Sequence, residues 1–266
     1  MIRSMHAELL KLRRPAIIYG AAGAMLGFAL LATVLTYATA TTTATVSRVG
    51  GDSLTSTVGQ LGQSGGLTRG FTIGAGFIGL LVFVLFATSM TSEYGLGTIR
   101  VLLLKQPRRA RLLAGKLLAL LACVAAVLFA AELLSSAAAV VLAHARGIPT
   151  TNWFTAAGLR HTAGDYANAL LAASLFGTVG MALGVLARST PLALGIGLAW
   201  LAPLEHLIQL SWGGAGRWLP GLVFDAVAAG GTTTTTYPRA VITAFAYAAL
   251  ALAAGTVIFL RRDVSV

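Results

Sequence analysis

Residues 71–92 read FTIGAGFIGLLVFVLFATSMTS, and no side chain in this stretch is charged. A helix needs about 20 predominantly apolar residues to cross a membrane, so the stretch is long enough to span a bilayer. The residues that follow, EYGLGTIRVLLLKQPRR at 93–109, carry one acidic and four basic side chains. The change from apolar to charged predicts that a span ends near residue 92 and that the chain leaves the membrane there.

The composition of the whole chain supports a membrane protein. Of its 266 residues, 19 are Lys or Arg and 8 are Asp or Glu, about 10% in all, against roughly 25% in a soluble domain. Hydrophobic residues make up 57%, and such a chain cannot cover a soluble surface with charge. The single cysteine, Cys123, cannot form an internal disulfide. These features exclude a soluble enzyme, a disordered chain and a secreted disulfide framework, and they predict an all-α polytopic membrane protein.

Charge-poor stretches of sufficient length recur along the chain and predict a single transmembrane domain over residues 1–266. The six expected spans are residues 15–40, 71–92, 112–143, 166–187, 191–210 and 237–260. Because six is an even number, both termini lie on one side of the membrane.

The positions of Lys and Arg predict which side that is. One side of the predicted topology holds 13 of them: Arg3, Lys11, Arg13, Arg14, Arg100, Lys105, Arg108, Arg109, Arg111, Lys116, Arg188, Arg261 and Arg262. The other side holds six: Arg48, Arg69, Arg146, Arg160, Arg217 and Arg239. Cytoplasmic loops carry the excess of positive charge, so both termini are expected in the cytoplasm. The net charge of +11 is then a matter of topology and is no sign of a nucleic-acid partner. Abundant Ala, Gly and Arg hint at a GC-rich bacterial gene and hence at the bacterial cytoplasmic membrane.

The N-terminal segment 2–14 has two readings. Ile2, Met5, Leu9 and Leu12 form one narrow stripe of a helix, which would lie flat in the inner interface against membrane lipid. The alternative is a basic flank that only fixes topology. The apolar run that follows is about 24 residues long, beyond the 7–15 of a signal peptide, so we expect no cleavage.

The two longer external segments differ in composition. Residues 41–70 are rich in Thr, Ser and Gly, whereas residues 211–236 place Trp212, Trp218 and Phe224 among glycines. Aromatic residues at a membrane boundary predict short interfacial or re-entrant helices in the second segment. Three glycine pairs have the spacing that allows helices to pack closely: Gly23/Gly27, Gly70/Gly74 and Gly180/Gly184.

The loop after the second span is dense in charge and predicts a short amphipathic helix within residues 93–107. Ser92 is a candidate cap for a new helix, with Glu93 in its first turn, and Gly95 and Gly97 let the chain bend. Pro107 would end the helix. Such an element suits docking onto a soluble partner, and the alternative is a basic surface loop that only sets topology.

The order Glu93, Gly97-Thr98, Arg100, Pro107, Arg109, Gly115-Lys116 resembles the coupling-helix region of bacterial ABC-2-type permeases. These are the membrane subunits of ATP-driven exporters of the drug- and lantibiotic-resistance kind. The family has an N-terminal interfacial helix, six spans, a coupling helix between spans two and three, and short re-entrant helices between spans five and six. The resemblance implies an ATPase-coupling surface that includes Glu93, Gly95, Gly97, Thr98, Arg100 and Arg109. Lys105-Gln106 departs from the small polar residue expected before Pro107.

The resemblance also implies the partners. The chain contains no Gly-x-x-x-x-Gly-Lys-Ser/Thr phosphate loop, so it is expected to be a non-catalytic permease without a cofactor of its own. ATP and Mg would bind in a separate ATPase, present in two copies, and a second permease would complete a homodimer or heterodimer. The expected cargo is amphipathic or hydrophobic: a drug, a peptide antibiotic or a lipid-like molecule. The alternative is an ATP-independent secondary transporter or channel.

Three ionisable residues at membrane depth are candidates for a transport path or gate, since charge is costly there. They are Glu132 in the third span and Glu205 with His206 near the end of the fifth. For Glu132 the alternative is a carboxyl that is protonated or bonded to Ser135 or Ser136. An intramembrane serine protease is disfavoured, because no Gly-x-Ser-x-Gly element surrounds Ser174. No His/Cys cluster predicts a metal site.

Overall fold

A computed structural model describes residues 15–41, 56–98 and 109–261. Six helical segments in this part are long and apolar enough to cross a membrane, as predicted. They are α2 (Pro15–Ala38), α4 (Arg69–Gly95), α6 (Arg109–Ala145), α7 (Ala156–Ala187), the continuous run of α8 (Thr190–Ala199), η1 (Trp200–Leu204) and α9 (Glu205–Ser211), and α11 (Tyr237–Arg261). The short helices are α3 (Val58–Leu61), η2 (Ala215–Arg217) and α10 (Pro220–Ala228). The expected N-terminal helix at 2–14 lies outside the described residues.

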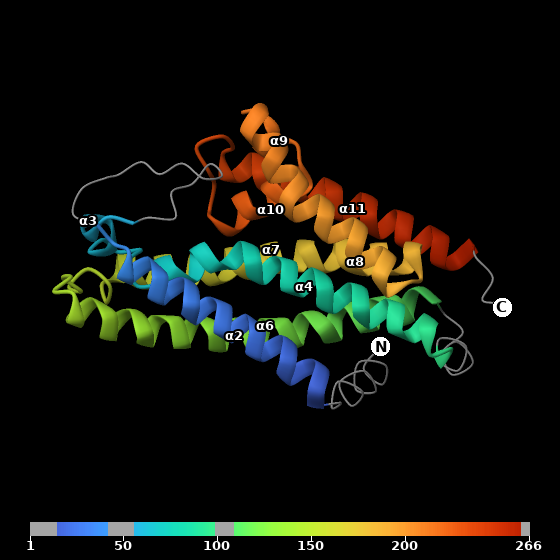
Figure 1. Ribbon diagram of the computed structural model, residues 1–266, viewed down its shortest axis with the longest axis horizontal. Coiled ribbons are helices and arrows are strands. Elements are labelled where there is room, and N and C mark those ends of the chain that lie inside the picture. Colours follow the sequence, from blue (N-terminus) through green and yellow to red (C-terminus); the bar gives the residue numbers. More distant parts are fainter. Residues whose placement is uncertain (1–14, 42–55, 99–108, 262–266) are drawn as a thin grey trace.

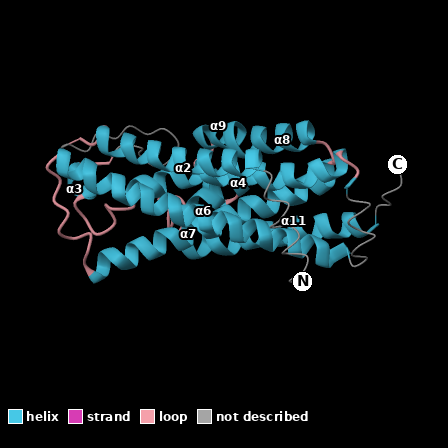
Figure 2. Ribbon diagram, turned by 90° about the horizontal axis from the view of Figure 1, so that it is seen from below, coloured by secondary structure: helices cyan, strands magenta, loops and turns pink. Residues whose placement is uncertain are grey.

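The long helices run side by side in one elongated bundle (Figures 1 and 2). Figure 1 shows the start of α2, the end of α4, the start of α6 and the end of α11 at the same end of the bundle. The opposite end holds α3 and the connection between α6 and α7. Because α2 starts and α11 ends at the same end of the bundle, the arrangement agrees with an even number of crossings. The positive charges predict that this end is cytoplasmic.

The helices α4 and α7 form the centre of the bundle, where glycines on one helix face aromatic rings on the other. Gly79 of α4 lies against the Phe176 ring, and a Cβ atom on Gly180 of α7 would come within 2.5 Å of the Phe83 carbonyl oxygen. Phe176 also meets Phe224 of α10 edge-to-face, with ring centroids 5.1 Å apart. Small residues therefore let these backbones approach closely.

The glycine pairs behave differently from one another. Gly70 and Gly180 each face a neighbouring backbone at a distance that leaves no room for a side chain. A Cβ atom on Gly23 or Gly27 would meet nothing within 4 Å. Close packing is thus confirmed for the pairs on α4 and α7 and is not seen for the pair on α2.

The helix that contains the fourth span begins before the predicted residue 166, because α7 already starts at Ala156. The first ten residues of the helix include Arg160, His161 and Asp165. Because these side chains are ionisable, the charge-free stretch that predicts the span starts only after them. The helix α6 has 37 residues, which at 1.5 Å per residue is about 55 Å, against a hydrocarbon core of about 30 Å. We infer that α6 and α7 extend together beyond the membrane as a helical hairpin.

The far end of this hairpin has a hydrophobic cluster of its own. Tyr37 and Trp153 are fully buried there, and their rings pack edge-to-face. The Tyr37 hydroxyl donates to the Gly66 carbonyl at 2.9 Å, and the Trp153 indole donates to the Leu61 carbonyl at 2.9 Å. The described parts of the segment 41–70 are therefore folded onto the helices.

The fifth span is interrupted where α8 gives way to α9. Residues Trp200–Leu204 form a π-helical turn that contains Pro203. Proline has no amide hydrogen and disturbs the regular hydrogen-bond ladder of a helix. After α9 the chain turns back through η2 and α10, and α10 lies against α7 and α11. The segment 211–236 thus contains η2 and α10, and their interfacial or re-entrant position stays a prediction.

Candidate functional site

The charged end of α4 is the best candidate for a functional site. We call it the α4 foot: residues 89–98, with Lys116 of α6 and Arg188 of the α7–α8 connection packed against them. The helix α4 continues through Gly95. Our expectation that Ser92 caps a new helix is therefore wrong: the Ser92 hydroxyl instead bonds the carbonyl of Ser89 within α4, at 3.4 Å. The predicted coupling segment thus begins as the last turn of the second span.

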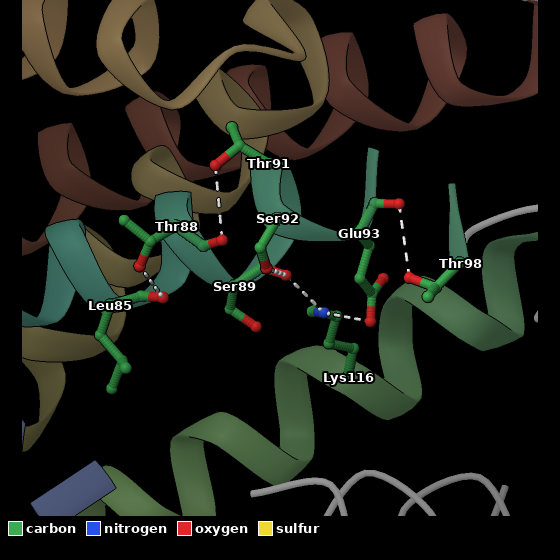
Figure 3. A network of polar contacts seen from close by, with 8 residues as sticks. All are labelled: Leu85, Thr88, Ser89, Thr91, Ser92, Glu93, Thr98 and Lys116. Atoms are coloured by element: carbon green, nitrogen blue, oxygen red, sulfur yellow. Dashed lines mark hydrogen bonds and ion pairs between the residues drawn. The ribbon is translucent and has the colours of Figure 1, made fainter. Parts of the chain in front are cut away.

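A buried ion pair joins the α4 foot to α6 (Figure 3). The Glu93 carboxylate lies 2.7 Å from the Lys116 ammonium, and the exposed fractions of these side chains are 10% and 4%. The ammonium also donates to the Ser89 carbonyl at 2.8 Å. A buried charge is tolerated only when it is paired and hydrogen-bonded. The pair therefore fixes the end of α4 against the beginning of α6.

A second set of contacts joins the α4 foot to the tight connection between α7 and α8. The Arg188 guanidinium lies over the Tyr94 ring, 5.2 Å from its centroid, a cation–π contact. The hydroxyl oxygens of Thr91 and Thr190 lie 2.7 Å apart, at hydrogen-bond distance. Arg188 ends α7 in a left-handed conformation with φ of 53°. The end of α4 therefore touches helix α6 and the α7–α8 connection, so a displacement of α4 would be felt by α6, α7 and α8.

The tip of the foot is exposed and has an unusual backbone. Gly95, Leu96, Gly97 and Thr98 are all exposed, Leu96 by 66%. Gly97 has a φ of 64°, which favours glycine, and the Thr98 hydroxyl donates to the Glu93 carbonyl at 3.4 Å (Figure 3). An exposed leucine beside glycines offers a partner protein an apolar contact on a backbone that can be approached closely.

The structure divides the predicted coupling residues into two groups. Gly95, Gly97 and Thr98 lie on the exposed tip, whereas Glu93 points inward onto Lys116. Arg100 lies outside the described residues, and Arg109 is the first residue of α6. The short helix expected within 93–107 therefore stays a prediction beyond residue 98.

The candidate gate residues Glu205 and His206 point in different directions. Glu205 is fully buried, and its Oε2 atom accepts a hydrogen bond from the Leu222 amide at 3.0 Å. His206 is exposed, and its Nδ1 atom lies 2.6 Å from the Ala202 carbonyl oxygen in the preceding turn. The two neighbours in sequence thus belong to different environments, and Glu205 faces α10.

Glu132 is buried in α6, with 4% of its surface exposed. Its Oε1 atom and the Oγ atom of Ser135, itself 1% exposed, have no hydrogen-bond partner among the described residues. The alternative in which the Glu132 carboxyl bonds Ser135 is therefore not seen. No group of three or more His, Cys, Asp or Glu side chains in the described part of the chain is arranged to hold a metal ion.

Sequence reasoning missed the role of Lys116. The charge count treats this residue as a topological cation, and the family resemblance places it in the Gly115-Lys116 motif, although it lies close to the start of a span. A signal was present: an acid at the end of one span and a base at the start of the next meet when the two helices pack antiparallel. The roles of Arg188 and Tyr94 carry no such signal, because the contact depends on the conformation of a two-residue connection.

Comparison with known proteins gives one match. The family model described as "ABC-2 family transporter protein" matches residues 4–201 of the chain. No curated protein and no solved structure matches it. The matched region includes the α4 foot and ends within the π-helical turn of the fifth span, so α9, α10 and α11 lie beyond it.

Proposed function

The chain belongs to the ABC-2 family of transporter proteins and is a multi-pass membrane protein with six apolar helices, and on this basis we propose that it is the permease subunit of an ATP-driven exporter. In this proposal a separate ABC ATPase, in two copies, binds ATP and Mg and supplies the energy. The permease works as a dimer in the bacterial cytoplasmic membrane, as a homodimer or with a second permease. Its cargo is amphipathic or hydrophobic, such as a drug, a peptide antibiotic or a lipid-like molecule.

The α4 foot is the observation that carries the proposal. Its tip, with Leu96, Gly97 and Thr98, is exposed at the end of the bundle that the positive charges predict to be cytoplasmic. An ATPase on that side would reach the tip without entering the membrane. The resemblance of the segment to a coupling helix points to the same residues.

The contacts behind the tip suggest how movement would pass into the membrane. A push on residues 96–98 acts on the last turn of α4. Glu93 transfers it to α6 through Lys116, and Tyr94 transfers it to the α7–α8 connection through Arg188. Because α4 and α7 pack closely over their length, they would shift as a unit, and the other spans would rearrange around them to give inward and outward states.

The burial and contacts of Glu205, Glu132 and His206 suggest a role for each residue. We assign Glu205 to the support of α10, which is argued further below. Glu132 remains a candidate for the transport path, since its carboxylate lies between spans with an oxygen that no described residue binds. His206 remains a candidate for the outer gate, because it is exposed near the end of the fifth span.

Co-purification with an ABC ATPase encoded next to the permease tests the proposal. The wild-type chain is expected to retain the ATPase in detergent and to raise its rate of ATP hydrolysis. Charge reversal at Arg100 together with Leu96→Asp should abolish both effects, because Leu96→Asp places negative charge on the exposed tip and the reversal removes a cation two residues after the tip in the sequence. Arg160→Glu is the matched control: Arg160 is exposed at the start of α7, on the opposite end, and its reversal should change neither.

Two outcomes would count against the proposal. If the tip variants bind and stimulate the ATPase as the wild-type chain does, the docking surface lies elsewhere. If no ATPase binds the wild-type chain and purified protein moves substrates in proteoliposomes without ATP, the chain is the secondary transporter or channel of the alternative hypothesis.

A further inference from the structure

Glu205 makes a contact that links two separate elements of the fold. Its side chain is fully buried, and its Oε2 atom accepts the Leu222 amide hydrogen at 3.0 Å. Leu222 is in the first turn of α10, which begins with Pro220. The first amide hydrogens of a helix lack partners within the helix, and a carboxylate there is favoured by the helix dipole. Glu205 of the fifth span therefore caps α10.

The surroundings of Gly221 show how closely the two elements approach. A Cβ atom on Gly221 would lie 2.8 Å from the Glu205 Oε2 atom and 2.9 Å from the Leu201 carbonyl oxygen. Both distances are too short for a real side chain. The absence of a side chain at residue 221 is thus what lets the carboxylate reach the helix start.

The contact between Glu205 and Leu222 lies directly after the irregular turn of the fifth span. The π-helical turn Trp200–Leu204 contains Pro203, and the Glu205 amide bonds the Trp200 carbonyl, five residues earlier. Such turns mark places where a helix is bent or strained. Because α9 begins at Glu205, the residue lies at the first position beyond the π-helical turn. It is well placed to hold the outer part of the span.

The cap also leads back to α4. Asp225, one turn further along α10, has its Oδ1 atom 2.8 Å from the position of a Cβ atom on Gly76. The helix α10 is therefore fitted closely against α4, whose other end is the α4 foot. Besides the direct contact of the foot with Thr190 of α8, a second route thus runs along α4 to α10 and through Glu205 to α9.

We propose that Glu205 is a positioning residue that fixes α9 on α10, so that the fifth span bends at residues 200–204 while α9 and α10 stay joined. The proposal deepens the exporter function proposed above and rests on it for the movement, whereas the contact itself is independent of any partner. Glu205 lies beyond the residues that the family model matches.

Spin labels at Leu207 of α9 and Ala229 at the end of α10 test the contact by pulsed dipolar spectroscopy. Both residues are exposed, and Cys123 is first replaced by Ala in the full-length chain. We expect a narrow distance distribution in the parent chain and in Glu205→Gln, which keeps an acceptor oxygen. Glu205→Leu should broaden or shift the distribution, and hydrogen exchange of the first turn of α10 should rise about tenfold or more, since the Leu222 amide loses its hydrogen-bond acceptor.

Substitutions at Gly221 and Gly213 test the same contact without changing Glu205, in case Glu205→Leu does not fold. Gly221→Ala should broaden the distribution as Glu205→Leu does, because its methyl group displaces the carboxylate. Gly213→Ala is the control, since a Cβ atom there would meet nothing within 4 Å, and it should leave the distances unchanged. If Gly221→Ala and Glu205→Leu both keep the narrow distribution and slow exchange of the parent, the inference is overturned.

The assembled complex separates this inference from the proposed function. With ATP, the distance between labels at Leu192 and Leu207, on either side of the bend, should change while the distance between Leu207 and Ala229 stays constant. A change at both pairs overturns the joint movement of α9 and α10. No change at Leu192 and Leu207 contradicts the proposed movement of the exporter, and the partner-free measurements still decide whether Glu205 fixes α10.

Discussion

The two ends of α4 are held by different kinds of contact. At its start, which we call the α4 head, a Cβ atom on Gly70 would lie 2.4 Å from the Thr33 Cα atom, and the Thr68 hydroxyl bonds the Asp165 carboxylate. At the α4 foot, the contacts are made by the long side chains of Glu93 and Lys116. At the head the backbones of α2 and α4 pack closely, whereas at the foot the contact with α6 is an ion pair between long side chains.

This difference teaches which end is suited to movement. Contacts between close-packed backbones are lost when two helices shift by a fraction of an ångström. An ion pair between long side chains is able to follow a small displacement by rotating about its side-chain bonds. The foot therefore suits the entry of mechanical force, and the head suits a fixed point about which α4 moves.

The largest expected effect concerns the ion pair of the foot. Lys116→Met leaves Glu93 buried without its cation, and loss of one partner of a buried pair costs about 3–5 kcal/mol of folding free energy. Adding Glu93→Met should restore most of this, because apolar residues of similar volume replace both charges. Urea unfolding in detergent micelles measures the three chains. Equal free energies of unfolding for Lys116→Met and the wild-type chain would show that the ion pair does not stabilise the fold.

The second effect concerns the head. Gly70→Ala should destabilise the fold by about 1–3 kcal/mol, since overpacking forces the backbones of α2 and α4 apart. The control is Gly23→Ala on α2, where a Cβ atom meets nothing within 4 Å, and it should be neutral or slightly stabilising. Thermal unfolding of the purified variants gives the comparison. If both substitutions have the same effect, the head is not a fixed point of close packing.

The third effect concerns the backbone of the tip. Gly97 has a φ of 64° with open space around it, so Gly97→Ala should cost about 1–2 kcal/mol from backbone conformation alone. Gly95→Ala is the matched control, because Gly95 also faces open space and has no positive φ. We expect Gly97→Ala to weaken stimulation of the ATPase and Gly95→Ala to leave it unchanged. If Gly95→Ala weakens the stimulation and Gly97→Ala does not, the backbone at Gly95 and not the positive φ of Gly97 matters for docking.

The smallest effect concerns the ring beneath Arg188. Tyr94→Leu removes a cation–π contact and should cost about 0.5–1 kcal/mol, whereas Tyr94→Phe keeps the aromatic face. Thermal unfolding of both variants beside the wild-type chain checks the difference. A loss of equal size in Tyr94→Phe would assign the effect to the hydroxyl group and would remove Arg188 from the contacts that hold the foot.

The outline of the fold could be predicted from the sequence because the bilayer imposes a simple demand. Residues 71–92 must be apolar to cross it, and every span was found in this way. The early start of α7 at Ala156 was missed because its first turns carry Arg160, His161 and Asp165 and extend beyond the apolar part. A rule based on apolar length does not register helix outside the membrane.

The sequence proposes a place for the candidate site but does not give its contacts. The motif around Glu93, Gly97 and Thr98 points to the end of α4, and its role in coupling stays a prediction. The pairing of Glu93 with Lys116 and the capping of α10 by Glu205 depend on which faces of two helices meet. That information lies in packing between residues far apart in the chain, and a single sequence does not hold it.

The stimulation of ATP hydrolysis by the Glu93→Met/Lys116→Met chain is the most direct test of the account. The partner ATPase is assayed in lipid nanodiscs, alone and with each permease, at equal yield of complex. We predict that the double variant folds and binds the ATPase as the wild-type chain does but loses most of the stimulation, because the exposed tip is intact and the joint behind it has lost its charges. Wild-type stimulation by the double variant would contradict the claim that the Glu93–Lys116 pair of the α4 foot passes force into the membrane.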